Sequence, residues 1–96
     1  MNDDATEIRR TVTIVNRRGL HARASARFVG AVSALPEGVE VHVAKDGNSA
    51  LGGSILGLMM LGAAKGDTVE LIVSGDNAET VMNDLAALVE SGFGED

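Results

Sequence analysis

A histidine and an arginine two residues apart are the strongest candidates for chemistry in this sequence. His21 lies between the strand-breaking Gly19 and the start of a predicted helix, and Arg23 follows it. The first turn of a helix offers unpaired backbone N–H groups and the positive end of the helix dipole, which together bind anions. A ring nitrogen of His21 could accept a phosphoryl group there, with Arg23 holding its oxygens. The alternative is that His21 only caps the helix and Arg23 is solvated.

Other candidates for catalytic or metal-binding residues are few. His42 lies on the polar side of an alternating strand, between two valines, so we expect a solvated side chain. The chain has two histidines on separate elements and no cysteine, which argues against a metal site. The glycines from Gly53 to Gly62 do not form a phosphate-binding loop with a lysine. We therefore expect neither a metal nor a cofactor.

The composition describes one small domain. The chain has 96 residues, of which 45% are hydrophobic and only 2% aromatic, so its core must be aliphatic. Domains commonly have roughly 100–150 residues, so a second independent core does not fit. No signal peptide is visible, and the longest apolar-rich run, residues 55–64, is far shorter than the ~20 residues of a membrane span. We expect a soluble, cytoplasmic monomer without membrane insertion.

Charge is unevenly distributed along the chain. The formal net charge is −6, yet residues 9–27 contain all six arginines and no acid. This distribution predicts a basic island at one end of an acidic body, suited to an anion or an acidic partner surface. Nucleic acid is disfavoured as a partner, because it would meet the acidic remainder and only two phenylalanines could stack on its bases. The predicted island comprises Arg9, Arg10, Arg17, Arg18, Arg23 and Arg27.

Hydrophobic periodicity predicts seven elements in the order β-α-β-β-α-β-α. Alternating β-branched and polar residues indicate strands, and apolar residues spaced by three or four indicate helices. Helices that alternate with strands favour an α+β fold with one antiparallel sheet covered on one face. The predicted strands are 9–15, 39–44, 48–51 and 69–74, and the predicted helices are 22–34, 55–61 and 78–91.

Three local signals mark where elements turn or begin. Asp46-Gly47 predicts a tight hairpin between the second and third strands. Ser54 is the predicted N-cap of the short second helix. Asp76 with Glu79 resembles a capping box, which predicts the start of the third helix.

Two motifs stand out along the chain: Gly19-Leu20-His21-Ala22-Arg23, and the run from Gly53 to Gly62 followed by Lys65-Gly66-Asp67. The first resembles the active-site signature, and the second resembles the second signature, of the HPr phosphocarrier family of the bacterial phosphoenolpyruvate-dependent phosphotransferase system. The resemblance implies an open-faced β-sandwich, with a four-stranded antiparallel sheet covered on one face by three helices. The expected boundaries are an N-terminal tail over 1–8, the domain over 9–91 and a C-terminal tail over 92–96.

The same resemblance implies a stoichiometric phosphoryl carrier, not an enzyme that turns over a free substrate. His21 would accept the group on Nδ1 from the phosphohistidine of Enzyme I and pass it to a histidine of a IIA acceptor, while Arg23 stabilises it. Phosphoryl transfer through a loose transition state needs positioning and charge more than covalent machinery. One nucleophile, one arginine and a helix end would therefore suffice.

Further roles follow from the resemblance for residues near the two motifs. Ser54 corresponds to a serine that the ATP-dependent HPr kinase/phosphorylase phosphorylates in many members; the alternative is an ordinary N-cap. The helix over 55–61 has almost no polar face, so some of its apolar surface should be exposed for partners. The alternative there is that Leu58 and Leu61 are core and the rest is partly exposed aliphatic surface. The implied docking face for both partners comprises, with Arg23, the residues Ala22, Ala26, Arg27, Ile55, Leu56 and Met59.

Two positions depart from the family pattern. Ala24 stands where many members have proline. In this respect the sequence resembles a nitrogen-related regulatory branch of the family, so the chain could serve nitrogen regulation instead of sugar uptake. Gly53 precedes Ser54 where lysine is frequent in the family. The sequence around Ser54 therefore differs from the one that the kinase recognises in other members.

A second function class has nearly the same element order. The order β-α-β-β-α-β is also that of ferredoxin-like domains, which include small-ligand-binding regulatory modules. Such a module would bind its ligand through backbone and loop contacts without phosphoryl transfer. It would have no need for His21 beside Arg23.

Overall fold

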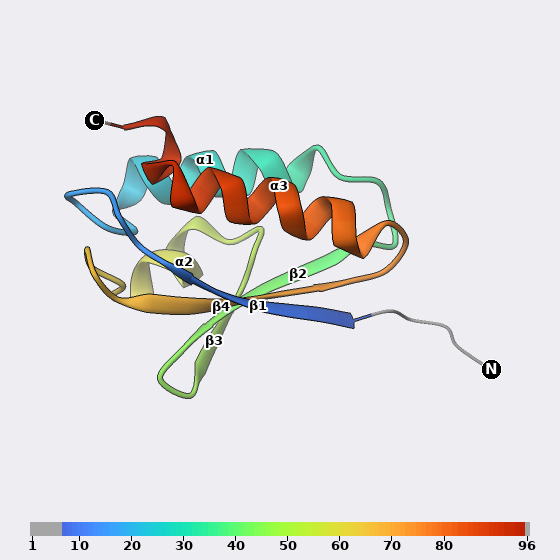
Figure 1. Ribbon diagram of the computed structural model, residues 1–96, viewed down its shortest axis with the longest axis horizontal. Helices are drawn as coiled ribbons and strands as arrows, with labels where there is room; N and C mark the ends of the chain where they lie inside the picture. The colour runs from blue at the N-terminus through green and yellow to red at the C-terminus, as the bar shows by residue number, and fades with distance from the viewer. Residues whose placement is uncertain (1–6, 96) are drawn as a thin grey trace.

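The computed structural model describes residues 7–95 and contains the predicted elements in the predicted order. Figure 1 shows the two long helices side by side over one face of the sheet. This arrangement is the expected open-faced sandwich. The strands are β1 (Glu7–Thr13), β2 (Glu40–Lys45), β3 (Asn48–Leu51) and β4 (Thr68–Ser74), and the helices are α1 (Ala22–Ser33), α2 (Ile55–Met60), α3 (Ala78–Glu90) and the 3₁₀ turn η1 (Gly92–Gly94).

The sheet has the strand order β1-β4-β2-β3, and every neighbouring pair is antiparallel. Leu71 of β4 lies between Arg10 of β1 and Val43 of β2 in this register. Strands β1 and β2 run parallel to each other with β4 between them, which is a split βαβ arrangement. Ferredoxin-like sheets contain the same arrangement, so the strand pairing is common to both function classes and the site at His21 has to distinguish them.

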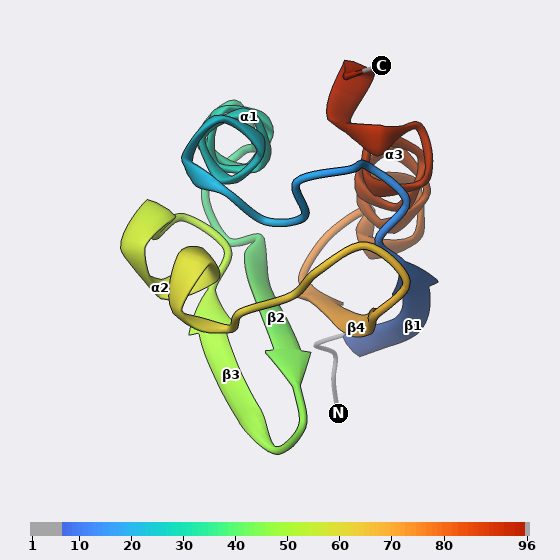
Figure 2. The same ribbon diagram turned by 90° about the vertical axis from the view of Figure 1, so that its left-hand side faces the viewer.

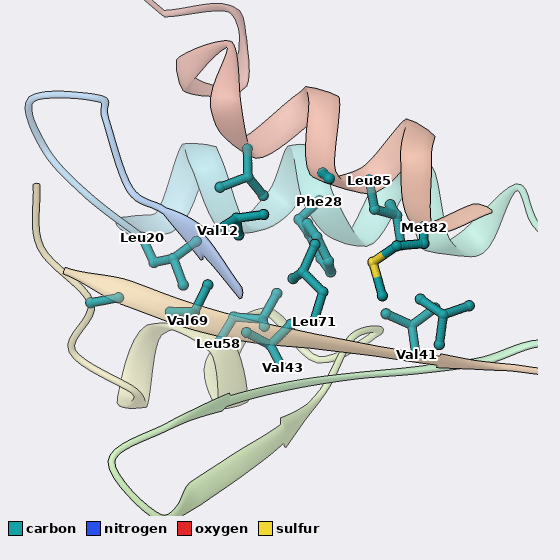
Figure 3. Close-up of a cluster of buried hydrophobic side chains, with 14 of the residues drawn as sticks. Val12, Leu20, Phe28, Val41, Val43, Leu58, Val69, Leu71, Met82 and Leu85 are labelled. Carbon is teal, nitrogen blue, oxygen red and sulfur yellow. The ribbon is translucent and has the colours of Figure 1, made fainter. Parts of the chain in front are cut away.

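The core lies between the sheet and the helices (Figure 3). Val69, Leu71 and Val73 of β4 are at most 2% exposed, because alternate residues of a strand point to the same face. Phe28 of α1 and Met82 of α3 are equally buried and meet the strands from above. Burying a side chain of this size stabilises the fold by roughly 1.5–3 kcal/mol. The core is aliphatic, as the composition predicts, apart from its two phenylalanines.

Of the predicted local signals, the hairpin at Asp46-Gly47 is present in the structure and the capping box before α3 is not. The hairpin prediction is confirmed, because Asp46 and Gly47 both have positive φ angles, 52° and 85°, as a tight β2–β3 turn requires. The capping box at Asp76 and Glu79 is wrong. Asn77 precedes α3 in the left-handed conformation with φ 59°, and no side chain caps the helix. The left-handed backbone at Asn77 turns the chain into the helix, so the residue before α3 is Asn77 and not the predicted cap Asp76.

The ends of the packed domain differ from the boundaries expected from sequence. Strand β1 begins at Glu7, and the rest of the expected N-terminal tail, residues 1–6, lies outside the described residues. At the other end, Phe93 is fully buried in the core, so the segment over 92–95 is packed instead of forming a tail. The physical reason is that Phe93, four residues beyond Val89 at the end of the apolar stripe of α3, can fold back onto the core through the positive-φ turn at Gly92.

Candidate functional site

His21 is the N-cap of α1 and faces the unpaired N–H groups at the start of that helix. Its φ and ψ angles are −76° and −178°, and its Nδ1 accepts a hydrogen bond from the backbone N–H of Arg23 at 3.3 Å. The side chain is 18% exposed, so the ring is largely enclosed but reachable from solvent. The placement at a helix N-terminus agrees with the sequence prediction. A phosphoryl group on Nδ1 would meet the helix N–H groups directly.

The loop before His21 is fixed by close backbone packing. Gly19 has φ +64°, and a Cβ at this position would lie 2.3 Å from the carbonyl oxygen of Ala63, so only glycine fits. The next residue, Leu20, donates its backbone N–H to the same carbonyl at 2.9 Å and is 7% exposed. Both contacts hold the chain immediately before the histidine. They give His21 a defined position without a contact to its ring.

The other ring nitrogen of His21 meets an acid that the sequence analysis did not identify. Nε2 lies 2.7 Å from Oε2 of Glu95, and Oε1 of Glu95 accepts a hydrogen bond from Nδ2 of Asn16 at 3.1 Å. Asn16 is 3% exposed and also donates to the carbonyl of Gly19 at 2.8 Å. Since a carboxylate accepts and the Arg23 N–H donates, the partners assign the proton to Nε2 and the lone pair to Nδ1.

The surroundings of Glu95 favour its ionised form. Burial raises the pKa of the carboxyl, but the hydrogen bonds from Asn16 and His21 and the nearby charges of His21 and Arg23 outweigh this effect. The resulting pKa lies below the ordinary value of 4.5. The acid is therefore a carboxylate at neutral pH, facing the ring of the candidate nucleophile.

Four arginines gather around His21. They surround an open depression of about 380 Å³, and Glu95 is the only acid in its lining among residues 7–95. The predicted basic island is thus correct in part: Arg9 lies instead against Glu7 and Glu70 on the sheet, and Arg10 donates to Asn83 of α3. The depression can bind an anionic group or an acidic partner side chain. Its lining comprises Arg17, Arg18, His21, Arg23, Arg27, Gly94 and Glu95.

Arg27 has a second contact that the sequence did not predict. Its Nη1 donates to the backbone carbonyl of Phe93 at 2.6 Å, which ties α1 to η1. The residue is still exposed, as its place on the expected docking face requires. Part of its guanidinium is nevertheless engaged within the chain.

Ser54 is the N-cap of α2, as predicted. Its Oγ accepts a hydrogen bond from the backbone N–H of Gly57 at 2.9 Å, and the residue is half-buried. The sequence interpretation as a cap is therefore confirmed. A capping contact and a modifiable hydroxyl are compatible, because one lone pair of the oxygen accepts the N–H while the hydroxyl borders solvent.

Helix α2 leaves apolar side chains on the surface beside α1. Leu58 is fully buried and Leu61 is half-buried, so the helix is anchored by these two residues. Helix α2 packs against α1 (Figure 2), whose Ala22 and Ala26 are exposed. All six residues expected to form the docking face are thus on the surface, and Met60 joins them although the sequence analysis omitted it. The exposed fractions on α2 are 40% for Ile55, 67% for Leu56, 40% for Met59 and 77% for Met60.

The remaining candidates form no site in the structure. His42 is half-buried between Val41 and Val43 on the sheet face opposite the core, as the alternation predicts. Within residues 7–95 there is no group of three or more histidine, cysteine or acidic side chains able to hold a metal ion. No helix in this part of the chain is long and apolar enough to cross a membrane.

A comparison with protein families matches residues 8–91 to the family described as "PTS HPr component phosphorylation site". Among curated proteins, the chain is 41% identical over 88 residues to the phosphocarrier protein HPr of Neisseria meningitidis serogroup A, covering 92% of this chain and 97% of that protein. It is also 36% identical over 90 residues to the phosphocarrier protein NPr of Shewanella violacea, covering 94% and 97% of the two chains.

Solved structures agree with these sequence similarities. The fold matches the crystal structure of HPr from Thermoanaerobacter tengcongensis with a TM-score of 0.84 and 38% sequence identity, over 93% of this chain and 98% of that one. It matches the crystal structure of HPr from Bacillus anthracis with a TM-score of 0.80 and 29% identity, over 86% and 96% of the two chains.

Proposed function

The chain belongs to the HPr phosphocarrier family of the phosphotransferase system, and from this premise we propose that Nδ1 of His21 is the atom that carries the phosphoryl group. The observation that supports the assignment is that the two ring nitrogens have different hydrogen-bond partners. Nε2 is engaged by Glu95 at 2.7 Å, whereas Nδ1 faces the N-terminus of α1. Only Nδ1 carries a lone pair in this tautomer, and it lies in an anion-binding environment. The 3.3 Å hydrogen bond from the Arg23 N–H to this lone pair breaks when Nδ1 bonds to phosphorus, and the N–H can then donate to a phosphoryl oxygen.

The transfer itself needs few parts. The lone pair of Nδ1 attacks phosphorus while the bond between phosphorus and the donor nitrogen breaks, and the departing electron pair stays with the donor. The N–H groups at the start of α1 donate hydrogen bonds to the oxygens of the group, and the guanidinium of Arg23 offsets their charge. The protein then holds one phosphoryl group per molecule until an acceptor takes it. This makes it a stoichiometric carrier.

We place Enzyme I, charged from phosphoenolpyruvate, as the donor and a histidine of a IIA-type protein as the acceptor. Both would dock on one face formed by the exposed residues of α1 and α2. The exposed apolar side chains beside the arginine-lined depression support this assignment, because interfaces combine an apolar centre with a charged rim. Flexible methionines such as Met59 and Met60 suit a surface that fits two partners. The reaction takes place in the cytoplasm in this proposal, with the carrier as a monomer.

Ser54 is the regulatory position of the same surface in this proposal, modified by an ATP-dependent kinase. Its hydroxyl lies directly before Ile55 and Leu56, so a phosphate there would add negative charge at the edge of the docking face. The N-terminus of α2 tolerates that charge locally, because it is the positive end of the helix. An acidic partner surface would be repelled.

The assignment of His21 is tested by phosphorylation of two matched variants. The protein is incubated with phosphoenolpyruvate, Mg²⁺ and Enzyme I, and the added mass is followed under alkaline conditions that preserve phosphohistidine. His21→Ala is expected to take up no phosphoryl group. His42→Ala, which removes the other histidine, is expected to react at the wild-type rate. Uptake by His21→Ala, or its loss in His42→Ala, would contradict the proposal.

A further inference from the structure

The C-terminal end of the chain contributes an acid to a site otherwise built from residues near the start. Glu95 lies 74 residues from His21 and 79 from Asn16 in sequence, yet its two carboxylate oxygens contact one each. Asn16 is held in turn by the carbonyl of Gly19, so the contact chain leads back into the fixed loop before the histidine. Among residues 7–95, His21 is the only basic side chain with a nitrogen within 4 Å of this carboxylate.

The segment that carries Glu95 is anchored at two points. The ring of Phe93 is fully buried in the core, and its carbonyl accepts a hydrogen bond from Arg27 at 2.6 Å. Phe93 has φ 59° between two glycines that also have positive φ, a conformation that a non-glycine residue keeps only where its surroundings hold it. Side-chain burial and a charged hydrogen bond thus fix the backbone next to Glu95.

We propose that Glu95 is a positioning residue for the phosphoryl transfer: it holds the proton on Nε2 of His21 and thereby presents Nδ1 as the nucleophile. This inference rests on the proposed function of His21 and assigns a role to a residue outside both sequence motifs. In neutral histidine, the partner of one ring nitrogen decides which nitrogen keeps the lone pair. Because both oxygens of Glu95 are engaged, the ring orientation is defined together with its tautomer.

Glu95 also acts on the charge that develops during transfer. His21 keeps its Nε2 proton while Nδ1 bonds to phosphorus, so the ring gains positive charge. The carboxylate at 2.7 Å from Nε2 stabilises that charge. Its lowered pKa keeps it ionised for this purpose at neutral pH. No proton leaves His21 at any step, so no general base is needed.

The opposite role, an acid that blocks the phosphoryl site, fits the geometry less well. Glu95 contacts Nε2, on the side of the ring away from the Arg23 N–H that faces Nδ1. A blocking carboxylate would sit where the phosphoryl oxygens bind, against that N–H. The two roles predict opposite effects of removing the acid: positioning predicts slower phosphorylation, and blocking predicts faster phosphorylation.

The first test uses the unphosphorylated full-length protein and does not depend on the carrier function. Nitrogen-15 NMR of the His21 ring at neutral pH should show a hydrogen-bonded proton on Nε2 in the wild type. Glu95→Ala should lose that signal as the proton exchanges with water. An unchanged Nε2 proton in Glu95→Ala would overturn the proposal, whatever the outcome for His21 as phosphoryl acceptor.

The second test measures the phosphorylation rate with Enzyme I. Glu95→Ala should lower kcat about tenfold, the size expected for losing a partly exposed hydrogen bond to a charged group, with KM changed less than about twofold. Glu95→Gln should recover part of the rate, since its amide oxygen can still accept from Nε2. Glu90→Gln, an exposed acid at the end of α3, is the control for net charge and should match the wild type. A wild-type or faster rate in Glu95→Ala would overturn the proposal.

Discussion

At His21, the two ring nitrogens have different partners, and this difference determines which nitrogen can act as the nucleophile. A backbone N–H at the start of α1 contacts Nδ1, and the side-chain carboxylate of Glu95 contacts Nε2. A lone histidine at a helix start is ordinary, and so is a histidine paired with an acid. Their combination leaves one defined nucleophilic atom in front of an anion-binding surface.

Arg23 should matter for the transfer step even when long-range charge effects are screened. Its guanidinium borders the depression around Nδ1, so Arg23→Ala should lower kcat about tenfold or more. The decrease should persist at about 0.5 M salt, because charges in contact are screened far less than distant ones. Phosphorylation rates at low and high salt measure this. Recovery of the Arg23→Ala rate in high salt would show that the arginine acts only in attracting the partner.

Glu95 should give the protein a defined acid sensitivity. Its pKa is lowered in the folded state, so its contribution to stability is fully present above the ordinary value of 4.5 and is lost as the pH falls through the lowered folded-state pKa. Glu95→Gln has no such group. The difference in unfolding free energy between the wild type and Glu95→Gln should therefore be constant at higher pH and shrink below about pH 4.5. Urea unfolding across this range measures the difference, and a gap that persists at the lowest pH would contradict the account.

At the level of elements, α2 combines an internal anchor with an external surface. Leu58 fixes the helix to the core, while the neighbouring side chains remain exposed beside α1. Six residues are too few for a helix that is stable alone, so tertiary packing must hold this surface in place. The helix therefore presents a fixed apolar patch to a partner.

Leu56→Glu tests the role of this patch. Leu56 is 67% exposed, so the substitution should leave the melting temperature unchanged while raising the KM for Enzyme I about tenfold or more. Thr80→Glu is the matched control, because Thr80 is exposed in the first turn of α3, at the end of that helix opposite to η1 and Glu95. Equal KM values for Leu56→Glu and Thr80→Glu would remove α2 from the docking face.

Two substitutions of Ser54 should separate its contribution to stability from its effect on docking. Ser54→Ala removes the acceptor of the Gly57 N–H and should lower the free energy of unfolding by ~1 kcal/mol without changing KM. Ser54→Asp keeps an N-cap oxygen, so it should remain stable while its added charge raises KM. Urea unfolding and phosphorylation kinetics measure the two effects. A large loss of stability in Ser54→Asp with unchanged KM would indicate a purely structural cap.

The sequence predicted those elements whose signals are local. Alternation in β4 and the apolar stripe of α1 depend on residues a few positions apart, and the Asp46-Gly47 turn depends on two. Helix α3 begins at Ala78 as predicted, but its capping box was mispredicted because a left-handed Asn77 replaces the side-chain cap. The position of Glu95 could not be predicted, because it depends on a partner 74 residues away. The one available signal was Phe93, an aromatic residue in an otherwise polar end of the chain.

Across the whole molecule, charge is segregated. The net charge is −6, yet four arginines surround the depression at His21. An acidic partner would therefore be attracted to one end of the carrier and repelled by the rest. This orients the encounter before any contact forms.

Arg17→Glu should reduce this attraction alone. Arg17 is exposed on the rim of the depression and makes no hydrogen bond to another side chain among the described residues, so its reversal should slow association with Enzyme I at low salt. The effect should largely disappear at about 0.5 M salt, where the Debye length is well below 10 Å. Arg27 is less suitable, because its reversal would also break the contact to Phe93. Association rates across a salt series measure the effect, and a salt-independent defect would assign Arg17 a direct role in transfer.

The central claim is that the phosphoryl group resides on Nδ1 of His21, with the Nε2 proton facing Glu95. It is tested most directly by phosphorus-31 and nitrogen-15 NMR of the intact protein after phosphorylation by Enzyme I, with alkaline peptide mapping to identify the residue. The account predicts a single acid-labile group on His21, coupled to Nδ1. A group on Nε2, or on any other residue, would contradict it.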